Sequence, residues 1–252
     1  MMPYLFEFGP IKIPSYGVML MTAFLTCYFL LNREFKKKGK DLEMASDAIF
    51  WAALGGILGA KLYYLIENYK LVISDPIGMI FSGSGLVFWG GLAGGMFAVI
   101  SYLKYKKEDW LEWTDFISPL LILGYAIGRI GCTLVGCDYG LPTNLPWGMT
   151  FPNGAPPTFI SVHPTQIYET LLGLVIFSIL WNLKYKLKKG FVFSLYLLLA
   201  STERFFIEFI RTNPKYFIGL SGAQIISIII ILTSLFLFYN FNKLSISEPK
   251  KS

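Results

Sequence analysis

Seven stretches of mostly apolar residues follow one another along the chain, separated by shorter polar connections. Each stretch holds about 20 residues, enough for one helix to cross the roughly 30 Å hydrocarbon core of a bilayer. The pattern predicts an all-α polytopic membrane protein with seven transmembrane helices, forming a single integral membrane domain over 1–252. The predicted spans are 14–31, 46–66, 86–103, 115–135, 165–183, 191–210 and 218–240.

Glycines gather in the second and third predicted spans, in LGGILGA and FWGGLAGGMF. Small residues let two transmembrane helices approach closely. We therefore expect both glycine-rich spans to serve close helix packing rather than flexibility.

The composition supports a membrane protein, since 54% of the residues are hydrophobic and 15% are charged. The net charge of +6 arises mainly in alternate connections, so the positive-inside rule predicts an outside N-terminus and a cytoplasmic C-terminus. No nucleic-acid partner is needed to explain this charge. Fifteen of the 22 basic residues lie in these connections: Arg33, Lys36, Lys37, Lys38, Lys40, Lys104, Lys106, Lys107, Lys184, Lys186, Lys188, Lys189, Lys243, Lys250 and Lys251.

The other connections hold four more: Lys12, Lys70, Arg211 and Lys215. The last three basic residues, Lys61, Arg129 and Arg204, lie in or at the ends of predicted spans, all toward the outer leaflet. An ionisable group inside a membrane is costly and marks a candidate functional site. Arg204, Glu208 and Arg211 have the spacing of one helix face. An internal ion pair between Arg204 and Glu208 is one explanation; the other is a cationic site for a phospholipid phosphate, which arginine binds at two points.

The longest predicted outside connection, 136–165, ends in HPTQIYE. Pro164 suits the first turn of the fifth span, and His163 is expected to cap its entry. Gln166 and Glu169 would share a face one turn apart. His163, the one histidine in the chain, is either an interfacial residue or a base beside a buried glutamate.

Tyr16 opens the first span, where a tyrosine is typical of the interfacial belt. Cys27 is expected to be an apolar filler. Cys132 and Cys137 allow simple packing, a disulfide, or a catalytic or metal-binding thiol. Two thiols and a distant histidine make no convincing ligand set, so no metal or organic cofactor is expected.

Several motifs together resemble the prolipoprotein diacylglyceryl transferases of bacterial membranes: PSYGVM, FWGGLAGG, DFISPL, GRIGCTLVGCDYG, HPTQIYE, RFFIEFIR and GAQIIS. The resemblance implies transfer of the diacylglyceryl group of phosphatidylglycerol to the lipobox cysteine of a prolipoprotein, the first step of lipoprotein maturation. A thioether would form and glycerol phosphate would leave. It also implies an enzyme of the bacterial cytoplasmic (inner) membrane, surrounded by membrane lipids, with its active site toward the outer face.

The resemblance further implies roles for individual residues. Arg129 and Arg204 would hold the lipid phosphate, while Tyr16, Glu169 and Glu208 would line the site. His163 is a candidate base. The other pocket candidates are Gln166, Trp89, Gly90, Gly91, Cys132, Gly140 and Arg211.

The chain departs from the family pattern where many members carry polar residues: Trp89 replaces a histidine and Ala200 a tyrosine, and Cys132, Val135 and Cys137 also stand at such places. One interpretation is an active enzyme whose base is His163, Glu169 or Glu208, or which relies on the thiolate already present. The alternative is a divergent member that binds phospholipid but acts on another acceptor, or a non-catalytic accessory protein. A transporter is disfavoured, because neither an inverted repeat nor a pair of Pro-interrupted spans is visible.

Overall fold

The protein is described here by a computed structural model that covers residues 2–8, 11–81 and 87–247. Its contacts form two compact units, one from 1–27 with 114–252 and one from 28–113. The first unit holds β1 (Tyr4–Phe8), β2 (Ile11–Pro14), the start of α1 (Ser15–Lys38), most of α6 (Trp110–Val135), β3 (Met149–Phe151), β4 (Thr158–Val162), α7 (Thr165–Leu183), α8 (Phe191–Ile207), the 3-10 turn η1 (Glu208–Ile210), β5 (Lys215–Phe217), β6 (Leu220–Ser221) and α9 (Gly222–Ser247).

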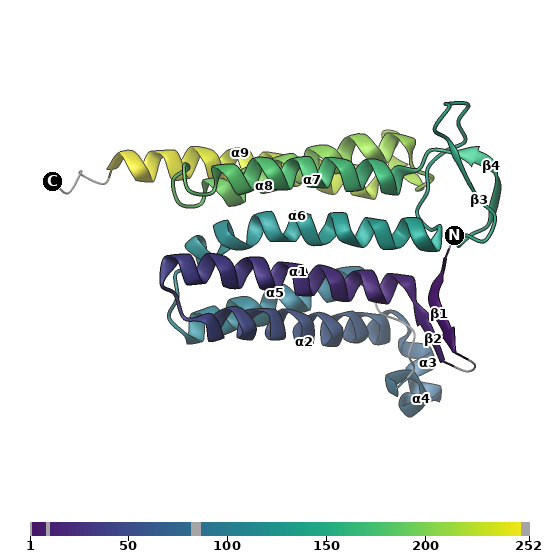
Figure 1. The fold of residues 1–252 in the computed structure, drawn as a ribbon, viewed down its shortest axis with the longest axis horizontal. Helices are drawn as coiled ribbons and strands as arrows, with labels where there is room; N and C mark the ends of the chain where they lie inside the picture. Colours follow the sequence, from purple (N-terminus) through teal and green to yellow (C-terminus); the bar gives the residue numbers. More distant parts are fainter. Residues whose placement is uncertain (1, 9–10, 82–86, 248–252) are drawn as a thin grey trace. The chain divides into compact units, whose positions relative to one another are not determined.

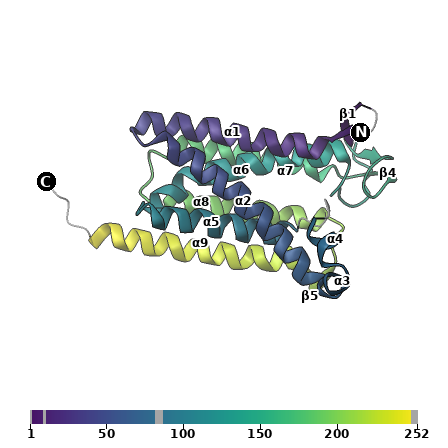
Figure 2. The same ribbon diagram turned by 90° about the horizontal axis from the view of Figure 1, so that it is seen from below.

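Helices α6, α7 and α8 of the first unit run side by side (Figure 1). Ile122 of α6, Ile176 and Leu180 of α7 and Val192 of α8 form their shared apolar core. Helix α9 lies beside α8 in both views (Figure 2). The strands form three antiparallel hairpins, β1 with β2, β3 with β4 and β5 with β6.

The hydrogen bonds at the first turns of α8 and α9 explain the polar residues of two sequence motifs, DFISPL and GAQIIS. Asp115 of α6 accepts hydrogen bonds from the backbone N–H groups of Gly190 (2.6 Å) and Phe193 (2.8 Å), which caps α8 from a neighbouring helix. Ser221 and Gln224 cap α9 reciprocally, because each side chain accepts a hydrogen bond from the other's backbone N–H. The aspartate of DFISPL and the glutamine of GAQIIS are therefore structural.

The second unit holds the rest of α1, the first residues of α6, and four further helices: α2 (Leu42–Glu67), α3 (Tyr69–Ser74), α4 (Pro76–Phe81) and α5 (Phe88–Tyr105). A Cβ atom on Gly59 would lie 2.3 Å from the carbonyl oxygen of Gly90, and one on Gly94 would lie 2.3 Å from that of Gly55. The two backbones touch, which confirms the packing predicted for the glycine-rich spans.

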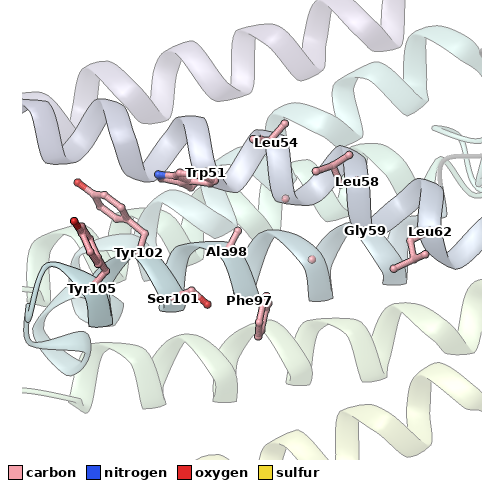
Figure 3. Close-up of a pocket in the computed structure, with 12 residues that line it drawn as sticks. Trp51, Leu54, Leu58, Gly59, Leu62, Phe97, Ala98, Ser101, Tyr102 and Tyr105 are labelled. Atoms are coloured by element: carbon pink, nitrogen blue, oxygen red, sulfur yellow. The ribbon is translucent and has the colours of Figure 1, made fainter.

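An apolar groove of about 520 Å³ lies between α2 and α5 (Figure 3). Trp51 and Leu58 line it from α2, and Phe97, Ala98 and Tyr105 line it from α5. Its lining contains no charged side chain. The groove therefore offers room for an apolar group, whereas charged side chains from α6, α7 and α8 meet in the first unit.

The structure has a helix at each of the seven predicted spans. Within the described residues, five of them are long and apolar enough to cross a membrane: α1, α2, α6, α7 and α9. The expectation of a mainly helical membrane protein is confirmed. Seven crossings, the outside N-terminus and the single domain stay predictions.

Candidate functional site

Three arginines and three carboxylates of the first unit converge in one ionic cluster. Helices supply Arg129 (α6), Glu169 (α7) and Arg204 (α8). Asp138 comes from the segment after α6, Glu208 from η1 and Arg211 from the residue after η1. The cluster thus unites the three motifs GRIGCTLVGCDYG, HPTQIYE and RFFIEFIR.

Glu169 is the centre of the cluster, and its side chain is fully buried. Its Oε2 lies 2.7 Å from Nε of Arg129, and its Oε1 lies 3.1 Å from Nη1 of Arg204 and 3.5 Å from Nη1 of Arg211. A single carboxylate therefore pairs with all three guanidinium groups. Such a buried charge is tolerated only because it is paired.

Asp138 forms ion pairs with both Arg129 and Arg211. Its carboxylate lies 3.1 Å from Nη1 of Arg129 and 2.9 Å from Nη2 of Arg211, and 44% of its side chain is exposed. Partial burial raises the pKa of Asp138, but the nearby charges of Arg211 and Arg129 outweigh this effect, so the pKa lies below its usual value. Asp138 is therefore ionised at neutral pH.

Glu208 pairs with Arg204 at 2.7 Å, as the ion-pair explanation requires, and this pair leaves the phosphate-site explanation open. Its other oxygen accepts a hydrogen bond of 2.7 Å from Nδ2 of Asn213. Arg211 contradicts the predicted single helix face, because α8 ends at Ile207 and Arg211 is extended (φ −92°, ψ 159°) after a 3-10 turn. Pro214 follows and cannot continue a helix, which favours this early end.

Gly140 brings Arg211 into the cluster. The two residues pair as an antiparallel bridge, and Leu141 N–H donates a 2.8 Å hydrogen bond to the carbonyl of Ile210. A Cβ atom on Gly140 would lie 2.4 Å from that carbonyl oxygen and 2.8 Å from Cγ2 of Thr165. Only glycine lets the two backbones come this close, so Gly140 is a positioning residue that holds Arg211 in the cluster.

The start of α7 holds the segment that carries Asp138. Gln166 is fully buried, and its Nε2 donates a 2.6 Å hydrogen bond to the carbonyl of Cys137. Thr165 Oγ1 donates one of 2.7 Å to the carbonyl of Asp138. Gln166 is thus a positioning residue for this segment.

His163 does not cap α7, so that prediction is wrong. The cap residue is Pro164, whose side chain has no hydrogen-bonding atom and so makes no cap bond. The half-buried His163 ring lies beside Tyr168, with Nδ1 3.4 Å from the phenol oxygen. Its role as a base stays a prediction.

Tyr16 and Cys132 lie near Arg129. A Cβ atom on Gly131 would lie 3.1 Å from Cδ2 of Tyr16, so this half-exposed tyrosine packs on α6 close to the arginine. The sulfur of Cys132 lies 3.8 Å from Nη1 of Arg129. Cys27, Cys132 and Cys137 are all free thiols in this structure, so the disulfide considered from the sequence is not formed.

Trp89, Gly90 and Gly91 belong to α5 in the second unit. Cβ atoms on the two glycines would lie 2.4 Å from the carbonyl oxygen of Gly59 and 3.3 Å from that of Gly56. The contacts of both glycines are those of helix packing. A pocket role for the three residues stays a prediction.

Comparison with known proteins places the chain in a family. The sequence profile of prolipoprotein diacylglyceryl transferases matches residues 3–240. The chain belongs to this family. A phosphatidylglycerol-prolipoprotein diacylglyceryl transferase of Clostridium tetani is 38% identical over 241 residues, which are 94% of this chain and 97% of the relative. Two further similar proteins are transferase 2 of Clostridium perfringens, 34% identical over 94% of both chains, and the transferase of Thermotoga petrophila, 33% identical over 99% of this chain and 87% of the relative.

Sequence reasoning missed three members of the site in this family member. Asp138 was visible in GRIGCTLVGCDYG but lies outside any helical repeat. Tyr125 stands one turn before Arg129, whose guanidinium lies 5.0 Å from the ring centre, a cation–π contact that the i, i+4 spacing signals. Glu203 is 7% exposed on α8, and its position beside Arg204 gave no sign of burial.

Proposed function

We propose that the protein transfers the diacylglyceryl group of phosphatidylglycerol to the lipobox cysteine of bacterial prolipoproteins, forming a thioether and releasing glycerol phosphate. Its family and the names of its relatives support this reaction class. The observation that carries the proposal is the convergence of three guanidinium groups on the buried carboxylate of Glu169. An arrangement that binds one oxyanion with three guanidinium groups suits a phosphate equally well.

Arg129 and Arg204 hold the lipid phosphate in this proposal, and Arg211 stands beside them. When the thiolate attacks the glycerol carbon, the bond from that carbon to the phosphate oxygen breaks and negative charge grows on the leaving phosphate. Guanidinium donors fixed in advance by ion pairs stabilise this charge without reorganising. The fixed positions come from Glu169, Asp138 and Glu208.

The acceptor thiol must lose its proton. An unperturbed thiol has a pKa of about 8.5, so a few per cent is already thiolate at neutral pH. Asp138 pairs with two arginines and its pKa is depressed, so this carboxylate is a weak base. His163, Glu169 and Glu208 stay the candidates for the base, and Tyr16 lines the same side of α6 as Arg129.

Five helices able to cross a membrane, together with bacterial relatives, place the protein in a bacterial membrane as a multi-pass protein. We further propose that it lies in the cytoplasmic (inner) membrane with its active site toward the outer face. The basic connections that mark the cytoplasmic side lie at the other ends of α6, α7 and α8 from the ionic cluster.

Complementation tests the proposal directly. A bacterium depleted of its own transferase would receive the wild-type chain or a variant, and one lipoprotein would be followed by mass. Wild type should restore the diacylglyceryl modification, while Arg129→Ala and Arg204→Ala should each lower the rate by about 10²- to 10³-fold. Arg204→Lys should also be impaired, because an ammonium group keeps the charge but loses the two-point fork.

Arg33→Ala is the matched control, since Arg33 is an exposed arginine of α1 in the second unit. It should retain wild-type activity. If the wild type reaches the membrane but modifies no lipobox protein, while still binding phosphatidylglycerol, the chain is the divergent lipid-binding member instead.

The base is tested by His163→Ala and Glu208→Gln at equal membrane levels. Loss of a general base lowers the rate by about 10²- to 10⁴-fold. A base acting on the thiol should be needed less as the pH rises, because the thiolate fraction grows. A variant with unchanged activity removes that residue from proton transfer.

A further inference from the structure

A pair of thiols lies at the end of α6, and the proposed function does not use them. Gly136 N–H and Cys137 N–H both donate to the carbonyl of Cys132, at 2.8 and 3.1 Å. Gly136 has a positive φ of 76°, which turns the chain back on the helix end. As a result the sulfurs of Cys132 and Cys137 and a carboxylate oxygen of Asp138 all lie within 4.8 Å of one another.

The surroundings of the two thiols differ in a way that suits stepwise oxidation. Cys132 is buried on α6, whereas Cys137 is only half-buried and lies beyond the helix. A hydrogen bond with Cys132 lowers the pKa of the Cys137 thiol below its ordinary value. The accessible Cys137 sulfur is therefore the better nucleophile. The buried Cys132 sulfur lies where it can attack the mixed disulfide that Cys137 forms.

A metal ion fits this place poorly. The carboxylate of Asp138 is already paired with Arg129 at 3.1 Å and Arg211 at 2.9 Å. A cation held by the two sulfurs and this carboxylate would stand beside two guanidinium groups, which repel it. Two thiols without further soft ligands also make an incomplete zinc set.

We propose that Cys132 and Cys137 form a reversible dithiol–disulfide site whose reagents are small or protein disulfides. The Cys137 thiolate attacks a disulfide R–S–S–R and releases one R–S⁻, leaving a mixed disulfide. Cys132 loses its proton, attacks the Cys137 sulfur and releases the second R–S⁻. The protein thiols are oxidised by two electrons, and the reagent disulfide is reduced to two thiols.

Closing the disulfide requires the sulfurs to come to about 2.05 Å. The sulfur of Cys132 lies 3.8 Å from Nη1 of Arg129 and 3.9 Å from Oδ2 of Asp138, so its movement disturbs the ion pair that orients this arginine. A displacement of about 1 Å at a positioning group costs about 10²-fold in rate. Oxidation should therefore inhibit the enzyme, an effect that rests on the proposed transfer function.

Thiol counting tests the site without any activity measurement. Full-length protein in detergent is incubated with oxidised glutathione, then alkylated with N-ethylmaleimide and weighed. We expect wild type to lose two alkylatable thiols with no bound glutathione, and dithiothreitol to restore both. Cys27→Ala is the control and should behave the same, since Cys27 lies on α1 with its thiol directed at the carbonyl of Leu120. Cys137→Ser should form no internal disulfide.

The site is overturned if wild type keeps all its thiols or collects stable glutathione adducts. A second arm compares diacylglyceryl transfer before and after oxidation. The rate of wild type should fall and recover with dithiothreitol, while that of Cys137→Ser should not respond to oxidised glutathione. A disulfide without any change in rate overturns the inhibition, whereas a chain with no transfer activity in either state overturns the proposed function and leaves the thiol count to decide the site.

Discussion

Replacing Glu169 by glutamine tests the ionic cluster most directly. The change keeps the size of the side chain but removes the charge that pairs with three guanidinium groups, at 2.7, 3.1 and 3.5 Å. At an effective dielectric constant of about 20, Coulomb's law gives each of these pairs about 5 to 6 kcal/mol. Desolvation of the buried ions offsets most of that attraction.

The expected net cost is that of breaking a buried ion pair, about 3 to 5 kcal/mol, because the arginines lose their common partner. For a chain of this length each kcal/mol lowers the melting temperature by about 2 to 4 °C. Glu169→Gln should therefore melt roughly 6 to 20 °C below wild type in detergent. Added phosphatidylglycerol should stabilise the variant more than wild type, since its phosphate can restore the missing negative charge.

Differential scanning fluorimetry or circular dichroism would measure both effects. Glu34→Gln is the matched control: Glu34 is also buried but lies outside the cluster, and it pairs with Lys37, whose side chain is 53% exposed, a kind of pair that contributes less than a buried one. If Glu169→Gln melts within the error of wild type, or no lower than the control, the ion pairs of Glu169 do not stabilise the folded protein.

Three further predictions follow from the same unit. Gly140→Ala should lower transfer activity in folded protein, because its Cβ atom would lie 2.4 Å from a backbone carbonyl oxygen. Gly222→Ala is the control and should keep its activity, since open space surrounds that position. Lipoprotein mass measures the activity of both variants, and the melting temperature shows whether they are folded. Asp138→Asn should flatten the acid dependence of the melting temperature. The pKa of Asp138 is depressed in the folded protein, so its ionised carboxylate contributes its full stabilisation above the pKa of the unfolded chain, about 3.9. That stabilisation disappears as the pH falls through the pKa of the folded protein. A variant that still loses stability like wild type below about pH 4 contradicts this. Asp115→Ala should cost about 0.5 to 2 kcal/mol by removing the cap of α8, and an unchanged melting curve refutes the capping role.

The helices could be predicted from the sequence because each depends on a local excess of apolar residues. Arg129, Glu169 and Arg204 could also be found, since a charge inside an apolar stretch needs a partner. The end of α8 could not, because the extended geometry of Arg211 depends on a bridge to Gly140, 71 positions earlier in the chain. Asp138 was missed because it lies beyond the end of α6, nine positions after Arg129 and 73 positions before Arg211, so no helical period connects the three residues.

The cluster has one consequence for selectivity. Three guanidinium groups pair with three carboxylates, so these ion pairs together carry no net formal charge. An incoming phosphate must exchange with a carboxylate rather than fill an empty cationic hole, and charge alone gives it little advantage. Free phosphate should thus compete weakly, whereas a phospholipid adds the burial of its acyl chains to the same exchange. In the proposed function, the site would therefore select a phosphate by the hydrocarbon attached to it.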